Sequence, residues 1–208
     1  MINFPGSTRV GKRLPKEAFY KHLPLTPALK AKFVSDVDRI VVENSLTKSN
    51  LNLVKEAEIK EVMLLSITLK KQDFDGKIVE AIARQNPHKL IFLLCYEDNR
   101  QLAVYHGKLY RTDWVPEDKV RLSLSGDNLD AIWDDLLQQV AVHSEAALGQ
   151  KGKTIDDQLK MQDEIDRLNK LIKKTETAVW KEQQPKKRFE LYTRMQEYRK
   201  QLEEITNG

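Results

Sequence analysis

Two apolar stretches decide the fold of this chain: VMLLSITL, residues 62–69, and LIFLLCY, residues 90–96. Both are apolar at consecutive positions, a pattern typical of strands that are covered on both faces. Between them, Ile78, Val79 and Ile82 recur at helical spacing. A strand, a short helix and a second strand predict a crossover unit, in which the two strands run parallel.

The residues after the second stretch are predicted to extend the sheet. Turn residues at 97–100 indicate that 101–106 pairs antiparallel with the second strand, and residues 109–114 would add another strand to this meander. Residues 120–124 alternate between apolar and polar and are expected to form an edge strand. A helix over residues 128–142 then presents one apolar stripe. The fold class predicted is α+β, a mixed sheet covered by helices.

The segment before the first stretch is predicted to be a polar arm followed by helices. Residues 1–13 suggest an extended arm, and residues 15–23 a short helix. Thr26 is a typical N-cap, and Pro27 suits the first helical position. They begin a predicted helix of about 18 residues, with the apolar side chains at intervals of three and four. Its stripe consists of Leu29, Phe33, Val37, Ile40 and Val41.

The composition changes at GQKGK, residues 149–153, which we interpret as a linker between an α+β domain at 1–148 and a helical segment at 154–208. Apart from Pro185, the helical segment continues without helix breakers until its end, and near-heptad apolar positions run along both of its halves. Two long helices joined near Pro185 are predicted to form an antiparallel hairpin or an oligomerising coiled coil.

Composition and length indicate one globular domain with an appendage and no membrane span. The chain has 208 residues, 32% of them charged, and a net charge of +4. Its apolar runs are far shorter than the roughly 20 residues that cross a bilayer, and its first residues show no signal peptide. The single cysteine, Cys95, cannot form an internal disulfide and is expected to be a buried free thiol. These features predict a cytoplasmic protein.

The sequence contains no convincing catalytic or metal-binding motif. A restriction-type nuclease would carry an acid two residues before a lysine at the end of the first stretch, but the matching positions are Thr68 and Lys70. Only one strand is predicted before the helix, which leaves no place for a second acidic ligand. The four histidines share no ligand spacing. We therefore expect no metal and no cofactor, and the sequence favours a non-enzymatic role.

Basic side chains gather in two parts of the chain. Residues 9–32 hold seven basic side chains and one acidic, and residues 170–200 hold ten and four, so each cluster has a net charge of +6. The second cluster is densest at the crest of the predicted hairpin, beside two aromatic residues. Such a crest can bind phosphate backbones or form a protein-binding hot spot, while a solvated coiled-coil surface would carry similar charges. The candidate binding residues are Lys181, Lys186, Lys187, Arg188, Trp180 and Phe189 at the crest, and Arg9, Lys12 and Arg13 in the arm.

Three blocks of sequence carry a family resemblance over nearly the whole chain. They are INFPGSTRV at 2–10 with LTPALK at 25–30 and DVDRI at 36–40, then the strand–helix–strand block ending in LIFLL at 90–94, then KEQ at 181–183 with FEL at 189–191 and LE at 202–203. In order and spacing they resemble the bacterial domain of unknown function 4391 family. The resemblance implies no activity. It implies a setting, because members are often encoded beside helicases and DNA methyltransferases of restriction-like or anti-phage systems.

In that family the residue two positions before the strand-end lysine tends to be acidic, and Thr68 departs from this tendency. We therefore expect a non-enzymatic accessory subunit that binds a partner protein, which the resemblance implies to be a helicase or a methyltransferase. The alternatives are direct, sequence-independent nucleic-acid binding by the two basic clusters and, third, a divergent nuclease. The C-terminal helices could also join copies of the chain into a homo-oligomer.

Overall fold

The computed structural model describes residues 2–17, 19, 23, 25–149 and 152–207 of the protein. The chain divides into two compact units, Met1–Ala141 and Val142–Gly208. Each unit is described below by itself. Parts of the predicted helix at 15–23 and of the predicted linker at 149–153 lie outside the described residues.

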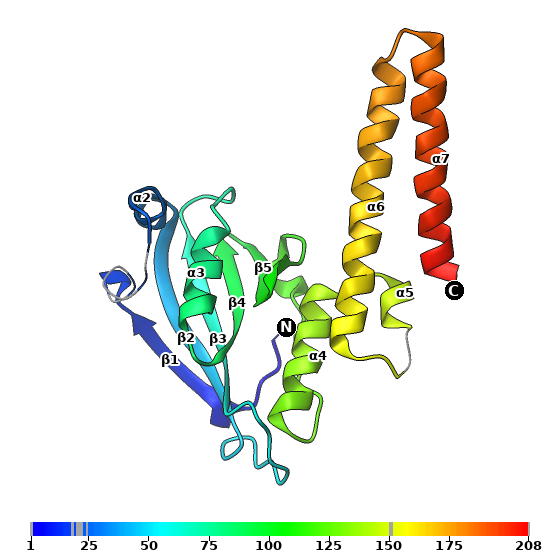
Figure 1. Ribbon diagram of the computed structural model, residues 1–208. Coiled ribbons are helices and arrows are strands. Elements are labelled where there is room, and N and C mark those ends of the chain that lie inside the picture. The colour runs from blue at the N-terminus through cyan, green and yellow to red at the C-terminus, as the bar shows by residue number, and fades with distance from the viewer. Residues whose placement is uncertain (1, 18, 20–22, 24, 150–151, 208) are drawn as a thin grey trace. The chain divides into compact units, whose positions relative to one another are not determined.

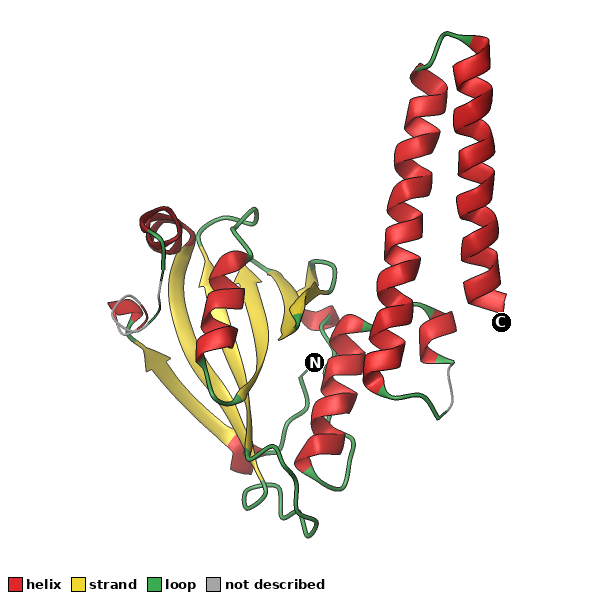
Figure 2. Ribbon diagram, in the orientation of Figure 1, coloured by secondary structure: helices red, strands yellow, loops and turns green. Residues whose placement is uncertain are grey.

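The first unit is built on one mixed sheet (Figure 2). β1 to β6 lie side by side in chain order, and β7 pairs with β5. The parallel pairing predicted for the two apolar stretches is confirmed, since Ser66 lies opposite Leu93 in parallel register. The antiparallel meander is confirmed as well. The strands are β1 (Arg9–Leu14), β2 (Val37–Thr47), β3 (Glu61–Leu69), β4 (Lys89–Tyr96), β5 (Asn99–His106), β6 (Lys108–Arg111) and β7 (Val115–Pro116).

Alternate strand residues point to opposite faces of the sheet, so the consecutive apolar residues of β3 and β4 give both faces apolar surface. Helices cover this surface. α3 (Lys77–Gln85) lies over one face, as Figure 1 shows, and its Ile78, Val79 and Ile82 join the core there. Ten other residues complete that core, namely Val37, Ile40, Leu65, Ile67, Leu69, Phe74, Leu90, Phe92, Leu94 and Ala103, together with Phe33 of α2 (Pro27–Asp36).

α4 (Leu129–Ala141) lies on the opposite face of the sheet from α3. The Lys89 ammonium sits 5.3 Å from the centroid of the Trp133 ring, and Lys89 alternates with the core residues Leu90 and Phe92 along β4. The described part of the unit also includes the short 3₁₀ helices η1 (Gly6–Thr8) and η2 (Glu117–Lys119). One sheet with helices on both faces confirms the predicted α+β class.

Two of the predicted elements are wrong. The helix predicted to run from Pro27 for about 18 residues ends at Asp36, and Val37–Thr47 is strand β2. The β-branched residues of this segment suit a strand as well as a helical stripe. The segment forms a strand because it pairs with both β1 and β3. The predicted edge strand at 120–124 is only a single bridge between Leu122 and Ile2.

The second unit consists of α5 (Glu145–Leu148), α6 (Ile155–Lys181) and α7 (Pro185–Asn207). α6 and α7 form an antiparallel hairpin within one chain, with Arg199 of α7 3.5 Å from Glu176 of α6 (Figure 2). The buried residues of α6 concentrate in its first half. Among the described residues of α7, Met195 alone is buried. Among the described residues, no helix of either unit is long and apolar enough to span a membrane.

Candidate functional site

The hairpin tip, which we define as residues 180–189, gathers six of the predicted site residues. Lys181 ends α6, and Lys186, Lys187 and Arg188 lie in the first turn of α7. The two aromatic side chains are unusually exposed, Trp180 by 84% and Phe189 by 71%. Because soluble proteins usually bury such large rings, exposed aromatic residues beside cations are typical of a contact surface.

Local hydrogen bonds build the turn at the tip. α6 ends at Lys181, and the backbone N–H of Glu182 still donates to Ala178 O. The Gln184 N–H donates to Glu182 Oε1 at 2.9 Å, and the Arg188 N–H donates to Gln184 O at 2.9 Å. Pro185 has no N–H to lose at the first turn of a helix, which suits it to the start of α7. The sequence therefore specifies the break at Pro185, and the structure shows that α7 returns along α6.

The four cations of the hairpin tip, Lys181, Lys186, Lys187 and Arg188, are exposed. None of them forms an ion pair with any described residue. The first turn of α7 contains no acidic residue, although the positive end of a helix dipole favours carboxylates there. The tip therefore keeps positive charge at the place where a helix is stabilised by negative charge.

Arg9, Lys12 and Arg13 lie in strand β1 of the first unit. All three are exposed, and β1 pairs with β2 on its inner side. They are therefore cations of a sheet edge rather than of an unstructured arm. Residues 18, 20–22 and 24 of the predicted N-terminal basic cluster lie outside the described residues.

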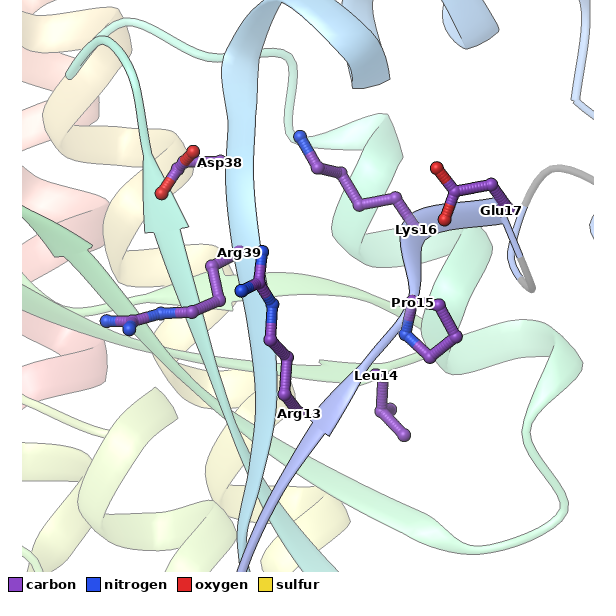
Figure 3. A pocket seen from close by; sticks show the side chains of 7 residues that line it. All are labelled: Arg13, Leu14, Pro15, Lys16, Glu17, Asp38 and Arg39. Carbon is purple, nitrogen blue, oxygen red and sulfur yellow. The ribbon is translucent and has the colours of Figure 1, made fainter.

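Arg13 and Arg39 project from β1 and β2 on the same face of the sheet (Figure 3). Arg13 lies opposite Val41, two residues from Arg39, so the two residues are diagonal neighbours on adjacent strands. A hollow of about 330 Å³ lies beside them, where Lys16 Nζ donates to Val37 O at 2.6 Å. Its lining comprises Arg13, Leu14, Pro15, Lys16, Glu17, Asp38 and Arg39.

A larger cleft of about 560 Å³ lies on the sheet face opposite α3, and we call it the sheet cleft. The strand register places one row of side chains across it: Arg39 opposite Thr68, Thr68 opposite Cys95, and Cys95 opposite Arg100. Its lining comprises Ile2, Arg39, Glu43, Asn44, Leu64, Ser66, Thr68, Leu93, Cys95, Glu97, Arg100 and Glu117.

Most charges in the sheet cleft already have partners. Ser66 Oγ donates to Glu43 Oε1 at 2.5 Å, and Arg100 Nη2 lies 2.5 Å from Glu117 Oε2. The Arg39 guanidinium pairs with no group in the part of the chain that the structure describes, and Glu43 is bonded to a neutral hydroxyl rather than to a cation. The sheet cleft therefore holds the exposed guanidinium of Arg39 together with the carboxylates of Glu43 and Glu97, while Arg100 and Glu117 neutralise each other.

Cys95 lines the sheet cleft and is half-buried, whereas the sequence suggested a thiol within the core. Its Sγ lies 3.6 Å from Leu93 O. Burial raises the pKa of the Cys95 thiol to about 11, although the Arg100 charge opposes that rise. A thiol with this pKa is protonated at neutral pH, so it acts as a weak hydrogen-bond donor rather than as a nucleophile.

The positions considered for a nuclease do not form a carboxylate site. Thr68 faces the sheet cleft, while the exposed Lys70 donates to Val34 O at 3.1 Å from the end of the strand. Contrary to the sequence-based expectation, two strands precede β3, and β2 brings Glu43 to the Ser66 hydroxyl. No group of three or more His, Cys, Asp or Glu side chains among the described residues is arranged to hold a metal ion.

Sequence reasoning missed the sheet cleft because its residues come from five separate segments. One signal was present, since Ser66 and Thr68 interrupt an apolar strand two residues apart and therefore share a face. Two hydroxyls at that spacing indicate that part of one face of β3 is not packed against apolar groups.

Comparison with known proteins gives one result. A family model described as Domain of unknown function (DUF4391) matches residues 2–202. Searches of curated proteins and of solved structures found no match. Because the match spans nearly the whole chain, both the sheet and the hairpin are parts of the family pattern. This protein belongs to the DUF4391 family.

Proposed function

We propose that this protein is a non-enzymatic interaction subunit that binds a partner protein through its hairpin tip. The observation that carries the proposal is the exposure of Trp180 and Phe189, at 84% and 71%, on the turn of a helical hairpin. Burying one large apolar side chain is worth about 1.5–3 kcal/mol. Protein-binding hot spots are enriched in Trp, Tyr and Arg, and the tip supplies two of these residue types.

The charges of the tip define the chemistry of the partner. Three cations occupy the first turn of α7. The interaction of each with the positive end of the helix dipole is unfavourable by about 0.3–1 kcal/mol. A partner surface with acidic groups around an apolar pocket would compensate these charges and accept the two rings. Charge complementarity of this kind speeds association and fixes orientation.

We propose that the partner is a helicase or a DNA methyltransferase of a restriction-like or anti-phage system, and that the complex acts in the cytoplasm. The family resemblance supports this setting, and the acidic surface required by the tip restricts the docking site on the partner. In this assembly the first unit of the present chain would act as a folded scaffold attached to the binding hairpin.

Co-purification with a candidate helicase or DNA methyltransferase tests the proposal. Trp180→Ala and Phe189→Ala should each weaken the complex by about tenfold or more, because each removes a ring that binding buries. Val54→Ala is the control, since Val54 is 89% exposed in the first unit. Equal binding by all three variants and the parent would reject the tip as the docking surface.

A second candidate function, direct nucleic-acid binding, is favoured by the exposed cations of the tip and of β1. Phosphate contacts release counterions, so the DNA affinity should fall steeply with salt. Reversing Lys186, Lys187 and Arg188 to Glu should abolish retention on DNA at low salt. Reversing Lys77, Lys119 and Lys153, which are also exposed, controls for net charge. No retention of the parent protein at low salt would exclude this function.

Self-association is a further outcome that the same variants distinguish. If the exposed rings joined copies of the chain, the parent would be a homo-oligomer and Trp180→Ala would be monomeric in light scattering. A monomeric parent that binds the helicase or methyltransferase would support the partner proposal instead.

A further inference from the structure

We propose that the sheet cleft binds a nucleoside monophosphate, either free or at the 5′ end of a nucleic-acid strand. The site lies within the first unit and is independent of the hairpin tip. Its volume of about 560 Å³ falls in the range of roughly 300–1,000 Å³ typical of small-molecule sites. The class of ligand follows from how charge and apolar surface are distributed along its strands.

One end of the sheet cleft is suited to an anion. Arg39 is exposed there without a partner among the described residues, whereas Arg13, diagonally beside it on β1, lines the neighbouring hollow. Thr68, opposite Arg39, adds a hydroxyl that can donate a hydrogen bond. A guanidinium fork and a hydroxyl are groups that commonly bind phosphate oxygens. Arg100 contributes less because Glu117 neutralises it.

The other end of the sheet cleft combines apolar side chains with the amide of Asn44, which lies opposite Leu64. Leu64 lies four residues before Thr68 on β3, a span of about 13 Å along the strand. Leu93, which lies opposite Ser66 on β4, and Ile2 add further apolar surface to the cleft. A ligand that fills both ends therefore needs a negative group and a flat apolar body separated by a polar linker. A phosphate, a ribose and a base meet that description.

Glu43 lies between the two ends and can contact the base. Its Oε1 accepts a hydrogen bond from Ser66, and this bond fixes the carboxylate while Oε2 remains available to a ligand. A carboxylate accepts hydrogen bonds from exocyclic amino groups of bases. We therefore select AMP as the probe, because adenine carries such an amino group.

Cys95 provides a direct report on occupancy. It lines the sheet cleft and is the single cysteine of the chain, so alkylation by iodoacetamide modifies one known position. The experiment uses the full-length protein at pH 8.5 and follows the modified fraction by intact mass. Saturating AMP should slow alkylation at least about tenfold by covering the thiol, while adenosine or inorganic phosphate at the same concentration should leave the rate within about twofold.

Arg39→Ala tests the phosphate contact. Losing a charge-assisted hydrogen bond should raise the AMP concentration needed for half-protection by about tenfold or more. Arg194→Ala, which removes an equally exposed arginine from α7, should leave that concentration unchanged. Because Arg39 is exposed, its replacement is not expected to unfold the unit, and circular dichroism checks this.

Oligonucleotides distinguish the two sources of the ligand. If a 5′-phosphorylated single strand protects Cys95 at lower concentration than AMP, and its 5′-hydroxyl counterpart does not, the ligand is a strand end. If AMP protects better than either strand, the ligand is a free nucleotide. The proposal is overturned if AMP gives no protection, if phosphate or adenosine alone protects equally well, or if Arg39→Ala and Arg194→Ala behave alike.

Discussion

Lys71 Nζ lies 2.8 Å from Asp36 Oδ1, and the Asp36 side chain is only 1% exposed. Ser35 Oγ donates to the same oxygen at 2.5 Å, and the Asp75 N–H reaches Oδ2 at 3.4 Å. This buried carboxylate joins the end of α2 to the loop after β3. It therefore holds the boundary at which the predicted helix gives way to strand β2.

Replacing Asp36 should destabilise the first unit and change its response to acid. Burial would raise the pKa of the Asp36 carboxyl, but hydrogen bonds from Lys71 and Ser35 lower it below its usual value of 3.8. Since the folded-state pKa is the lower one, the ionised carboxylate stabilises the fold above about pH 4, and this stabilisation is lost as pH falls through the folded-state pKa. Asp36→Asn should lower the free energy of unfolding at pH 7 by about 1–3 kcal/mol and remove this part of the acid dependence.

Urea unfolding followed by circular dichroism between pH 3 and pH 7 measures both effects. The control is Asp73→Asn, an exposed carboxylate in the same loop that should change stability by less than about 0.5 kcal/mol. An Asp36→Asn protein with the parent's acid dependence would contradict the assignment.

Gln162 should be essential to the second unit because its fully buried side chain holds two backbone N–H groups. Its Oε1 accepts from the His143 and Ser144 N–H groups at 3.1 and 2.8 Å, and its Nε2 donates to Asp166 Oδ1 at 2.9 Å. Gln162→Leu keeps the size of the side chain but leaves both N–H groups without their acceptor. Unfolding experiments should show a loss of about 2 kcal/mol or more. Gln201→Leu, at an exposed position of α7, should be nearly neutral.

Gly126 is expected to tolerate no side chain. Its φ is +142°, and an added Cβ would lie 2.8 Å from the Ile132 backbone nitrogen in α4. Gly126→Ala should therefore cost about 1–3 kcal/mol of stability in thermal or urea unfolding. Gly6→Ala is a matched control, because open space surrounds Gly6. Equal stability of the two variants would show that the loop can move away from α4.

The tip and the base of the hairpin should respond differently to truncation. Leu168 is fully buried, so Leu168→Ala should destabilise the second unit by about 2–5 kcal/mol. Trp180→Ala should change stability by less than about 0.5 kcal/mol, since its ring is mostly in solvent. Hydrogen exchange of α6 amides measures both. A large stability loss in Trp180→Ala would mean that the ring serves folding rather than binding.

Alkylation of Cys95 in the unliganded protein should be slow at neutral pH. Burial raises the pKa of this thiol from 9.0 to about 11. At pH 7 it should therefore present about 100-fold less thiolate than a thiol of pKa 9. The iodoacetamide rate should rise about tenfold per pH unit up to roughly pH 10. N-acetylcysteine is the reference, and a plateau near pH 9 would contradict the raised pKa.

The sequence predicted the elements whose patterns are local. The consecutive apolar residues of β3 and β4, the stripe of α3 and the break at Pro185 each specify an element without help from distant residues, and all four are confirmed. The residues of the hairpin tip are also close together in the sequence, because α6 ends at Lys181 and α7 begins at Pro185.

Residues 37–47 show where local patterns are insufficient. Val37, Ile40 and Val41 recur at helical spacing, but they also favour extended backbone. Strand β2 forms because hydrogen bonds to β1 and β3 satisfy its backbone on both sides, and its apolar residues enter the core under α3. That outcome depends on partners far away in the sequence.

The sequence by itself determined the α+β composition, the parallel pair of strands and two long helices that meet at a basic, aromatic segment near Pro185, while leaving open whether these helices form a hairpin within one chain. Only the tertiary structure decided that Arg39, Thr68, Cys95 and Arg100 form one row across the sheet. The physical reason is that a helix brings together residues three or four apart, whereas a sheet brings together residues according to strand register. Register depends on the pairing of whole strands, and no single stretch of the chain contains it.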